Sequence, residues 1–126
     1  MGHPTVYPTG VTLYDPAKAY NGYTVMPVKG QGAMLIDMNG QEIKLWKGVH
    51  GFPNKIFPGG YLLGSRGIRN PKYGLQDQVD LIQVDWDGNV VWEYTIRDEN
   101  KVAHHGFDRL PNGNTAMLIW EKMSSG

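Results

Sequence analysis

His104 and His105 form the one adjacent pair of histidines in the sequence, and they are the residues best suited to nucleophilic or acid–base chemistry. A neutral imidazole is a competent nucleophile near pH 7, and neighbouring groups can tune its protonation. If both residues lie in extended chain, their side chains point to opposite faces, so we expect at most one to face a given pocket. The alternative is that both are structural, with one ring bonding a backbone carbonyl of a neighbouring element.

Arg66 and Arg69 lie in a glycine-rich segment, residues 64–74, which is expected to connect two strands. A guanidinium group binds planar or tetrahedral anions through two parallel hydrogen bonds, so both arginines are candidate substrate-binding residues. The segment is not a phosphate-binding loop, because no helix is expected after it and its glycine spacing fits neither the Walker nor the Rossmann pattern. A solvated connector with scattered cations is the competing interpretation.

Aspartates gather between Asp77 and Asp87, but their spacing does not match a calcium-binding EF-hand loop. We expect Asp85 and Asp87 to form turns instead. The chain has no cysteine, which excludes disulfides, thiolate metal sites and cysteine nucleophiles. No metal and no cofactor are therefore expected.

The composition narrows the class of protein. Twelve basic and 12 acidic residues cancel, so no net charge favours binding to nucleic acid or to an anionic membrane. Seventeen glycines, eight prolines and 11% aromatic residues indicate an all-β chain of short strands and many turns. No apolar run has the length of a membrane span and no secretion-type segment follows Met1, so the expected location is the cytoplasm.

The strands expected to position the candidate residues recur along the chain. Residues 33–36 and 41–46 are expected to form a hairpin across Asn39-Gly40, the dipeptide favoured in type I′ turns. Residues 79–84 and 89–94 are expected to form a second hairpin. The aspartates and glycines of the two turns stand 48 residues apart.

A second sequence motif, a turn followed by an apolar strand, also occurs in two copies. Pro58-Gly59-Gly60 and Pro111-Asn112-Gly113 are both expected to turn into an apolar strand, and they stand 53 residues apart. The strand after the later turn, residues 115–120, barely alternates between polar and apolar residues, so we expect it to be mostly buried. The four tryptophans are expected to fill the space between packed elements, although one at a rim can stack on an aryl ring.

A repeat of about 50 residues with two hairpins is typical of a β-propeller blade, which is a four-stranded antiparallel sheet. The sequence therefore predicts one β-propeller-like segment over residues 1–126. It begins with an irregular region at 1–30, in which residues 11–14 and 23–28 are expected to form short strands and residues 15–19 one helical turn capped by Asp15. A first blade repeat at 31–78 and a second at 79–126 follow. A generic all-β sandwich is the alternative.

The length creates a difficulty for a propeller. Two to three blades of about 50 residues fit into the chain, whereas closed propellers have about four to eight. An incomplete propeller leaves strand edges and apolar blade faces exposed. We therefore expect either that the chain is a piece of a longer protein with the remaining blades, or that copies assemble as a homo-oligomer.

Several phrases resemble the arylsulfotransferase (aryl-sulfate sulfotransferase) family. They are residues 3–12, 20–24, 35–40, 51–55, 69–74, 77–80 and 84–92, together with the His-His-x-Phe and Leu-Pro-Asn-Gly-Asn-Thr sequences within 104–115. The likeness spans essentially the whole chain and is specific in sum, since each phrase alone is common to propeller blades. The resemblance implies the N-terminal part of a six-bladed propeller.

Members of that family move a sulfuryl group from an aryl sulfate to a phenolic acceptor without a nucleotide donor. They use a histidine that becomes transiently sulfated in a funnel at the propeller's centre. The resemblance makes His104 and His105 the candidate catalytic residues. The sequence departs from the family in two ways: Gly106 replaces the aspartate of a His-His-Asp phrase, and the family's chains are several times longer.

Two hypotheses for the function follow. The first is a fragment or small relative of an arylsulfotransferase, with aryl sulfates and phenols as its small-molecule partners. Such chemistry requires donors around the sulfuryl oxygens, an in-line nucleophile and a proton for the leaving phenolate. The second is a non-catalytic propeller module that binds a ligand or partner, or assembles with copies of itself.

Overall fold

The computed structural model describes residues 11, 13–68, 72, 73 and 77–125, and its secondary structure consists of ten strands. This confirms the prediction of an all-β chain. None of the described residues forms a helix of the length and apolarity that a membrane crossing requires. The strands are β1 (Thr24–Val28), β2 (Gly32–Ile36), β3 (Glu42–Lys47), β4 (His50–Phe57), β5 (Tyr61–Ser65), β6 (Asp77–Gln78), β7 (Asp80–Val84), β8 (Val90–Thr95), β9 (Lys101–Arg109) and β10 (Thr115–Glu121).

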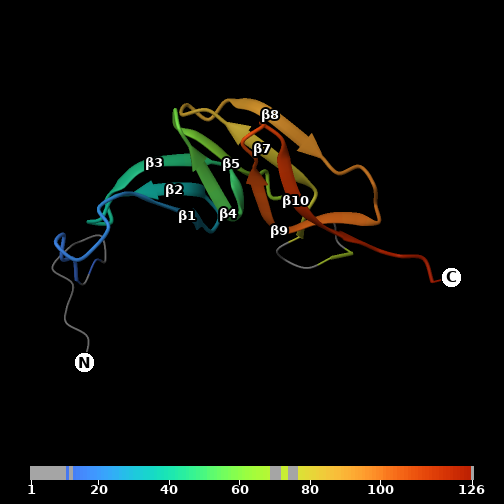
Figure 1. Cartoon of the computed structure of the whole chain (residues 1–126), viewed down its shortest axis with the longest axis horizontal. Helices are drawn as coiled ribbons and strands as arrows, with labels where there is room; N and C mark the ends of the chain where they lie inside the picture. The colour runs from blue at the N-terminus through green and yellow to red at the C-terminus, as the bar shows by residue number, and fades with distance from the viewer. Residues whose placement is uncertain (1–10, 12, 69–71, 74–76, 126) are drawn as a thin grey trace.

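The strands form three antiparallel sheets, and the antiparallel pairing agrees with the predicted hairpins. The N-terminal sheet has the order β1-β2-β3, the central sheet β4-β5-β7-β8, and the C-terminal sheet β10-β9-β6. Figure 1 shows the sheets following one another along the molecule in sequence order. β6 lies between β5 and β7 in sequence, but it pairs with β9 and so ties the central segment to the C-terminal sheet.

The sheets are offset from the two sequence repeats. The central sheet takes β4 and β5 from residues 31–78 and β7 and β8 from residues 79–126. The reason is that β7 pairs with β5, at Leu62↔Val84 and Leu63↔Gln83, so the later hairpin completes the earlier one. The four-stranded unit therefore runs from His50 to Thr95.

The two hairpin turns at Asp37 and Asp85 share one geometry. In the first, the Asp37 N–H donates to the Gln41 carbonyl at 3.1 Å, and the Asp37 carboxylate accepts from the N–H groups of Asn39 and Gln41, both at 2.9 Å. The type I′ prediction is wrong, because Gly40 has φ 74° while Asn39 does not have a positive φ. The carboxylate holds the first residues of the turn in a right-handed conformation, and the glycine alone adopts the left-handed one.

The first described residues differ partly from expectation. Residues 11, 13 and 14 are not in a strand. The expected turn after Asp15 is present, because the Asp15 carboxylate accepts from the Ala17 N–H at 3.0 Å and the Asp15 carbonyl accepts from the Lys18 and Ala19 N–H groups. The expected strand near residues 23–28 is β1.

The apolar core is divided between the two faces of the central sheet. One cluster joins it to the N-terminal sheet and consists of Ala33, Leu35, Trp46, Val49, Leu62, Ile82 and Val84. The other joins it to the C-terminal sheet and consists of Leu63, Leu81 and Phe107, with Phe57, Trp92 and Met117 packed against it. Because side chains alternate along a strand, Leu62 and its neighbour Leu63 enter different clusters. The central sheet is thus a layer with apolar neighbours on both sides.

Polar contacts reinforce both interfaces. On the N-terminal side, the Trp46 indole N–H donates to the Asp85 carbonyl at 3.0 Å, and the Trp46 and Trp86 rings meet edge to face at 5.4 Å. On the C-terminal side, the Arg109 guanidinium donates to the Gln83 side-chain oxygen at 2.6 Å and lies 4.9 Å from the Trp92 ring centre.

The prediction that residues 115–120 are mostly buried is wrong. They form β10, as expected, but Leu118 and Trp120 are 63% and 54% exposed. β10 is at one edge of the C-terminal sheet, which has no second sheet on its outer side among the described residues. The expectation that tryptophans fill the space between packed elements holds for Trp46, which is buried between two sheets. Trp86 and Trp120 are exposed.

Candidate functional site

His104 and His105 lie in an irregular part of β9. β9 pairs with β10 at Phe107↔Met117 and again at Ala103↔Ile119, so residues 104–106 stand opposite Leu118 alone. A bulge of this kind bends a strand and redirects its side chains, and bulges are common beside functional sites. On its other edge β9 is held by β6, where His104 pairs with Asp77.

The two imidazoles touch each other. His105 has φ 54°, and it is the one described non-glycine residue with a positive φ. This left-handed conformation breaks the alternation of the strand, and the His104 and His105 rings meet edge to face at 4.8 Å. The expectation that the two side chains point to opposite faces was conditional on extended chain and does not apply here. Its premise, an extended backbone at both residues, does not hold at His105.

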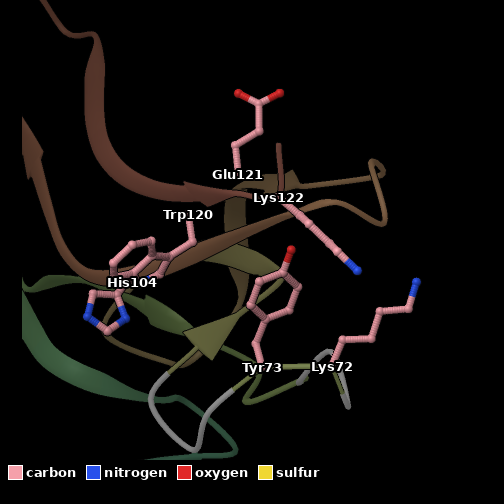
Figure 2. Close-up of a pocket in the computed structure, with 6 residues that line it drawn as sticks. All are labelled: Lys72, Tyr73, His104, Trp120, Glu121 and Lys122. Atoms are coloured by element: carbon pink, nitrogen blue, oxygen red, sulfur yellow. The ribbon is translucent and has the colours of Figure 1, made fainter. Parts of the chain in front are cut away.

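His104 lines an open pocket of about 620 Å³. The other lining residues are Lys72, Tyr73, Trp120, Glu121 and Lys122. The His104 ring meets the Trp120 ring at 5.3 Å and an interplanar angle of 68°. Figure 2 shows these two rings together, with Tyr73 and Lys72 projecting from the loop that connects β5 to β6 and the Glu121 carboxylate extending away from the rings.

The walls of the pocket are tied together at one backbone carbonyl. The Asn100 carbonyl accepts from the Tyr73 hydroxyl at 2.8 Å and from the Lys122 N–H, also at 2.8 Å. These contacts join the β5–β6 loop, the β8–β9 connection and the end of β10. Lys72 adds an ion pair with Glu99 at 3.4 Å.

The acidic residue of the pocket is partly neutralised by a lysine on β9. Lys101 Nζ lies 3.3 Å from a Glu121 carboxylate oxygen and 3.6 Å from Asp98. The hydrogen bond to Glu121 raises the pKa of Lys101 above its usual value. The pairing directs Glu121 toward Lys101, and the other basic residues that line the pocket are Lys72 and Lys122.

Arg66 has a structural environment of its own. The guanidinium of Arg66 lies 2.6 Å from a Glu93 oxygen and 3.8 Å from an Asp80 oxygen. The backbone N–H of Arg66 donates to the Asp80 carboxylate at 3.0 Å. Asp80 is buried and also accepts from the Ser65 hydroxyl at 2.6 Å. These contacts pair Arg66 with two carboxylates on β7 and β8, and the pocket beside His104 does not include it. Arg69 lies outside the described residues.

Asp85 and Asp87 lie in the connection between β7 and β8, as expected. Asp85 accepts from the N–H and the side-chain amide of Asn89, and the side-chain contact is the main reason that the pKa of Asp85 lies below its usual value. Within the described part of the chain, no three histidine, aspartate or glutamate side chains come close enough together to hold a metal ion.

Four functional candidates were not predicted from the sequence. The sequence predicted packing for the tryptophans, with stacking on an aryl ring as the alternative for one of them and without singling out Trp120, and it predicted no role for Lys72, Tyr73 or Lys122. The loop 64–74 had been noted for its arginines, and the same loop carries Lys72 and Tyr73. The signal that could have revealed them is a cation next to an aromatic residue, which occurs at Lys72-Tyr73 and nearly so at Trp120 and Lys122.

The arrangement suits an aromatic anion. Two aromatic side chains offer flat apolar contact, two ammonium groups offer positive charge, and an imidazole offers a nucleophile or a proton carrier. These conclusions come from the geometry of the pocket itself. No protein-family model, curated protein or solved structure matches the chain.

Proposed function

We propose that the chain is a segment of a β-propeller enzyme of the arylsulfotransferase type, which transfers a sulfuryl group from an aryl sulfate to a phenol. The observation that carries the proposal is the composition of one pocket, in which His104 lies with two aromatic and two cationic side chains. An aryl sulfate is an aromatic ring joined to a tetrahedral anion. The pocket offers a partner for each part and a nucleophile beside them.

The sheets support the propeller part of the proposal. The central sheet has four antiparallel strands and packs its two faces against neighbouring sheets, as a blade does in a propeller. The β2–β3 hairpin corresponds to β7–β8, and the β9–β10 hairpin corresponds to β4–β5. On this proposal, the central sheet is one blade, and the two outer sheets are parts of the blades on either side of it.

The pocket suggests how an aryl sulfate binds. The aryl ring packs against Trp120 and Tyr73, because flat aromatic surfaces gain from stacked or edge-to-face contact. The sulfate group is placed at the His104 end of the pocket, because attack on sulfur requires the imidazole beside it. Lys72 and Lys122, which line the same pocket, attract the anion through their positive charge.

The reaction proceeds in two steps. In the first, an imidazole nitrogen of His104 bonds to sulfur while the bond between sulfur and the aryl oxygen breaks. The aryl oxygen leaves with the bonding electron pair and takes a proton, for which the adjoining His105 ring is the candidate donor. In the second, a phenol oxygen bonds to sulfur as the nitrogen–sulfur bond breaks, and the phenol proton passes to His105.

The test is turnover of an aryl sulfate whose phenol is coloured. We expect repeated turnover to depend on a phenolic acceptor. When the acceptor is left out, we expect release of one phenol per protein molecule and an intact mass with one added sulfuryl group. His104→Ala removes both signals, whereas the matched variant His50→Ala, on β4 and outside the pocket, retains them. A folded wild-type sample with neither phenol release nor added mass would contradict the proposal.

A non-catalytic propeller module that binds an aromatic anion is the second candidate, and the pairing of Arg66 favours it. With its guanidinium held by Asp80 and Glu93, Arg66 is not positioned as a sulfate ligand in this pocket. The pocket then binds without transfer. An aryl sulfonate, which cannot donate a sulfuryl group, distinguishes the two: saturable binding that depends on Trp120, together with no turnover of the sulfate, supports the module.

A further inference from the structure

The outer edge of β10 is a strand edge with one hydrogen-bonded neighbour in the described structure. β10 pairs with β9, and the C-terminal sheet ends there. A free edge presents a row of N–H and C=O groups with which another strand can pair. The β4–β5 hairpin of the same chain indicates which kind of strand pairs with this edge.

The β9–β10 hairpin is built like the β4–β5 hairpin. In the earlier one the Gly60 N–H donates to the Phe57 carbonyl at 3.1 Å, and in the later one the Gly113 N–H donates to the Leu110 carbonyl at 2.9 Å. In both, the first strand carries extra residues, 51–54 opposite Gly64 and 104–106 opposite Leu118. β10 therefore corresponds to β5.

β5 has a partner on the edge that is open in β10. β7 pairs there at Leu62↔Val84 and Leu63↔Gln83, and β8 follows β7 through the Asp85 turn. At the 53-residue spacing, Thr115 on β10 matches Leu62. The strand expected along β10 is therefore one that corresponds to β7.

A pocket lies beside β10, where a strand corresponding to β7 would pack. It measures about 320 Å³ and is lined by Leu81, Trp92, Tyr94, Thr115, Met117 and Ile119. Tyr94 and Ile119 are 48% and 44% exposed, although the corresponding interface on the other face of the central sheet is closed by buried Trp46. The Thr115 hydroxyl is buried and has no hydrogen-bond partner in the described structure.

The closed interface also shows how an added hairpin would be held. Trp46, on β3, donates to the Asp85 carbonyl at the start of the β7–β8 turn. Tyr94, on β8, stands 48 residues after Trp46. Its ring therefore occupies the position from which the outer strand of one sheet contacts the turn of the next.

We propose that the β10 edge and the adjoining pocket are a docking site for a β-hairpin of the β7–β8 kind. Its first strand pairs antiparallel with β10 and places apolar side chains between β10 and β8. An Asp-x-x-Gly turn then reaches Tyr94. The hairpin belongs to a polypeptide segment outside residues 1–126. Such strand addition combines backbone hydrogen bonds with pockets for alternate side chains, and it does not depend on catalysis at His104.

The test uses the full chain and a synthetic peptide with the sequence of residues 79–96, followed by amide chemical shifts and amide hydrogen exchange. We expect saturable binding with a Kd of about 1 mM or tighter, and slowed exchange in β10. Ile119→Lys, in the pocket, weakens binding at least about tenfold. Leu118→Lys, on the other face of β10, leaves binding within about twofold.

Three results would overturn the proposal. They are no change in β10 amides at millimolar peptide, protection confined to other strands, and equal loss of binding in the two lysine variants. A peptide with proline at the positions of Ile82 and Val84 serves as the peptide control, because proline cannot donate to the ladder. Equal binding of that peptide would also contradict strand pairing.

Discussion

The rings of His104 and His105 lie 4.8 Å apart although the two residues are neighbours in one strand. Adjacent side chains of a regular strand point to opposite faces, so this contact exists because His105 has φ 54°. A left-handed backbone at a residue other than glycine costs about 1–2 kcal/mol. The surrounding bulge therefore sustains a conformation that isolated chain would avoid.

Replacement of His105 tests that strain. His105→Val is expected to lower the free energy of unfolding by about 1–3 kcal/mol, because a β-branched residue tolerates positive φ poorly. His105→Gly, which adopts this conformation without a steric cost, is expected to be more stable than the valine variant. Urea denaturation of the two variants measures the difference. Equal midpoints would show that the backbone at residue 105 is not strained.

The buried carboxylate of Asp80 is expected to be a strong determinant of stability. Asp80→Ala leaves the Ser65 hydroxyl and the Arg66 N–H without their acceptor, at a cost of about 3 kcal/mol. Asp87→Ala, in an exposed turn, is the matched control and is expected to change stability by less than about 0.5 kcal/mol. Similar unfolding midpoints for the two variants would contradict this assignment.

The contact between Lys55 and Asp108 predicts a pH dependence. The hydrogen bond from Lys55 lowers the pKa of Asp108 from its usual 3.8. Since the pKa is lower in the folded chain, the stabilisation is present above the unfolded pKa and is lost as the pH falls through the folded one. Lys55→Gln is expected to return the pKa of Asp108 toward 3.8. Stability is then expected to depend less on pH below that value, because the folded and unfolded pKa values of Asp108 become similar.

An NMR titration of the carboxyl groups provides the measurement and its control. The pKa of Asp85 is lowered mainly by Asn89, so it is expected to stay unchanged in the Lys55→Gln variant. A shift of both aspartates would indicate a global change in the fold. No shift of Asp108 would mean that Lys55 does not set its pKa.

Gly64 is expected to resist substitution. A Cβ at this position would lie 2.6 Å from the Asn54 side-chain nitrogen, 2.7 Å from the His50 carbonyl and 2.8 Å from the Val49 side chain. Gly64→Ala is therefore expected to cost about 1–3 kcal/mol, as overpacking does in a filled core. Gly88→Ala, which meets nothing within 4 Å, carries the backbone cost alone and is the comparison. Thermal unfolding of both variants ranks them.

The hairpins were predictable because they are local. Alternation of residues and the two recurring turn phrases placed β2–β3, β7–β8 and the strand of β10 correctly. The turn type was not predictable from Asn39-Gly40 alone, since the Asp37 carboxylate decides it by accepting two backbone N–H groups. Nor does periodicity say which hairpin pairs with which, so the sheet from His50 to Thr95 crosses the boundary between the two repeats.

The candidate site was predicted in part. The histidine pair drew attention because the repeat does not account for it, and His104 does line a pocket. Its neighbours come from a loop and from the end of β10, and their meeting at the Asn100 carbonyl is a long-range contact without a local signature. Arg66 was predicted to bind substrate, but its nearest partners are carboxylates on strands 14 and 27 residues further along the chain.

The middle strands of the central sheet, β5 and β7, are covered on both faces, since Leu62 and Leu63 enter different clusters. Melting the central sheet uncovers both clusters at once, whereas melting either outer sheet uncovers one. In stacked architectures such nearest-neighbour coupling governs cooperativity. The chain is therefore expected to fray from its two ends toward the middle, with the amides of β5 and β7 the last to exchange with water.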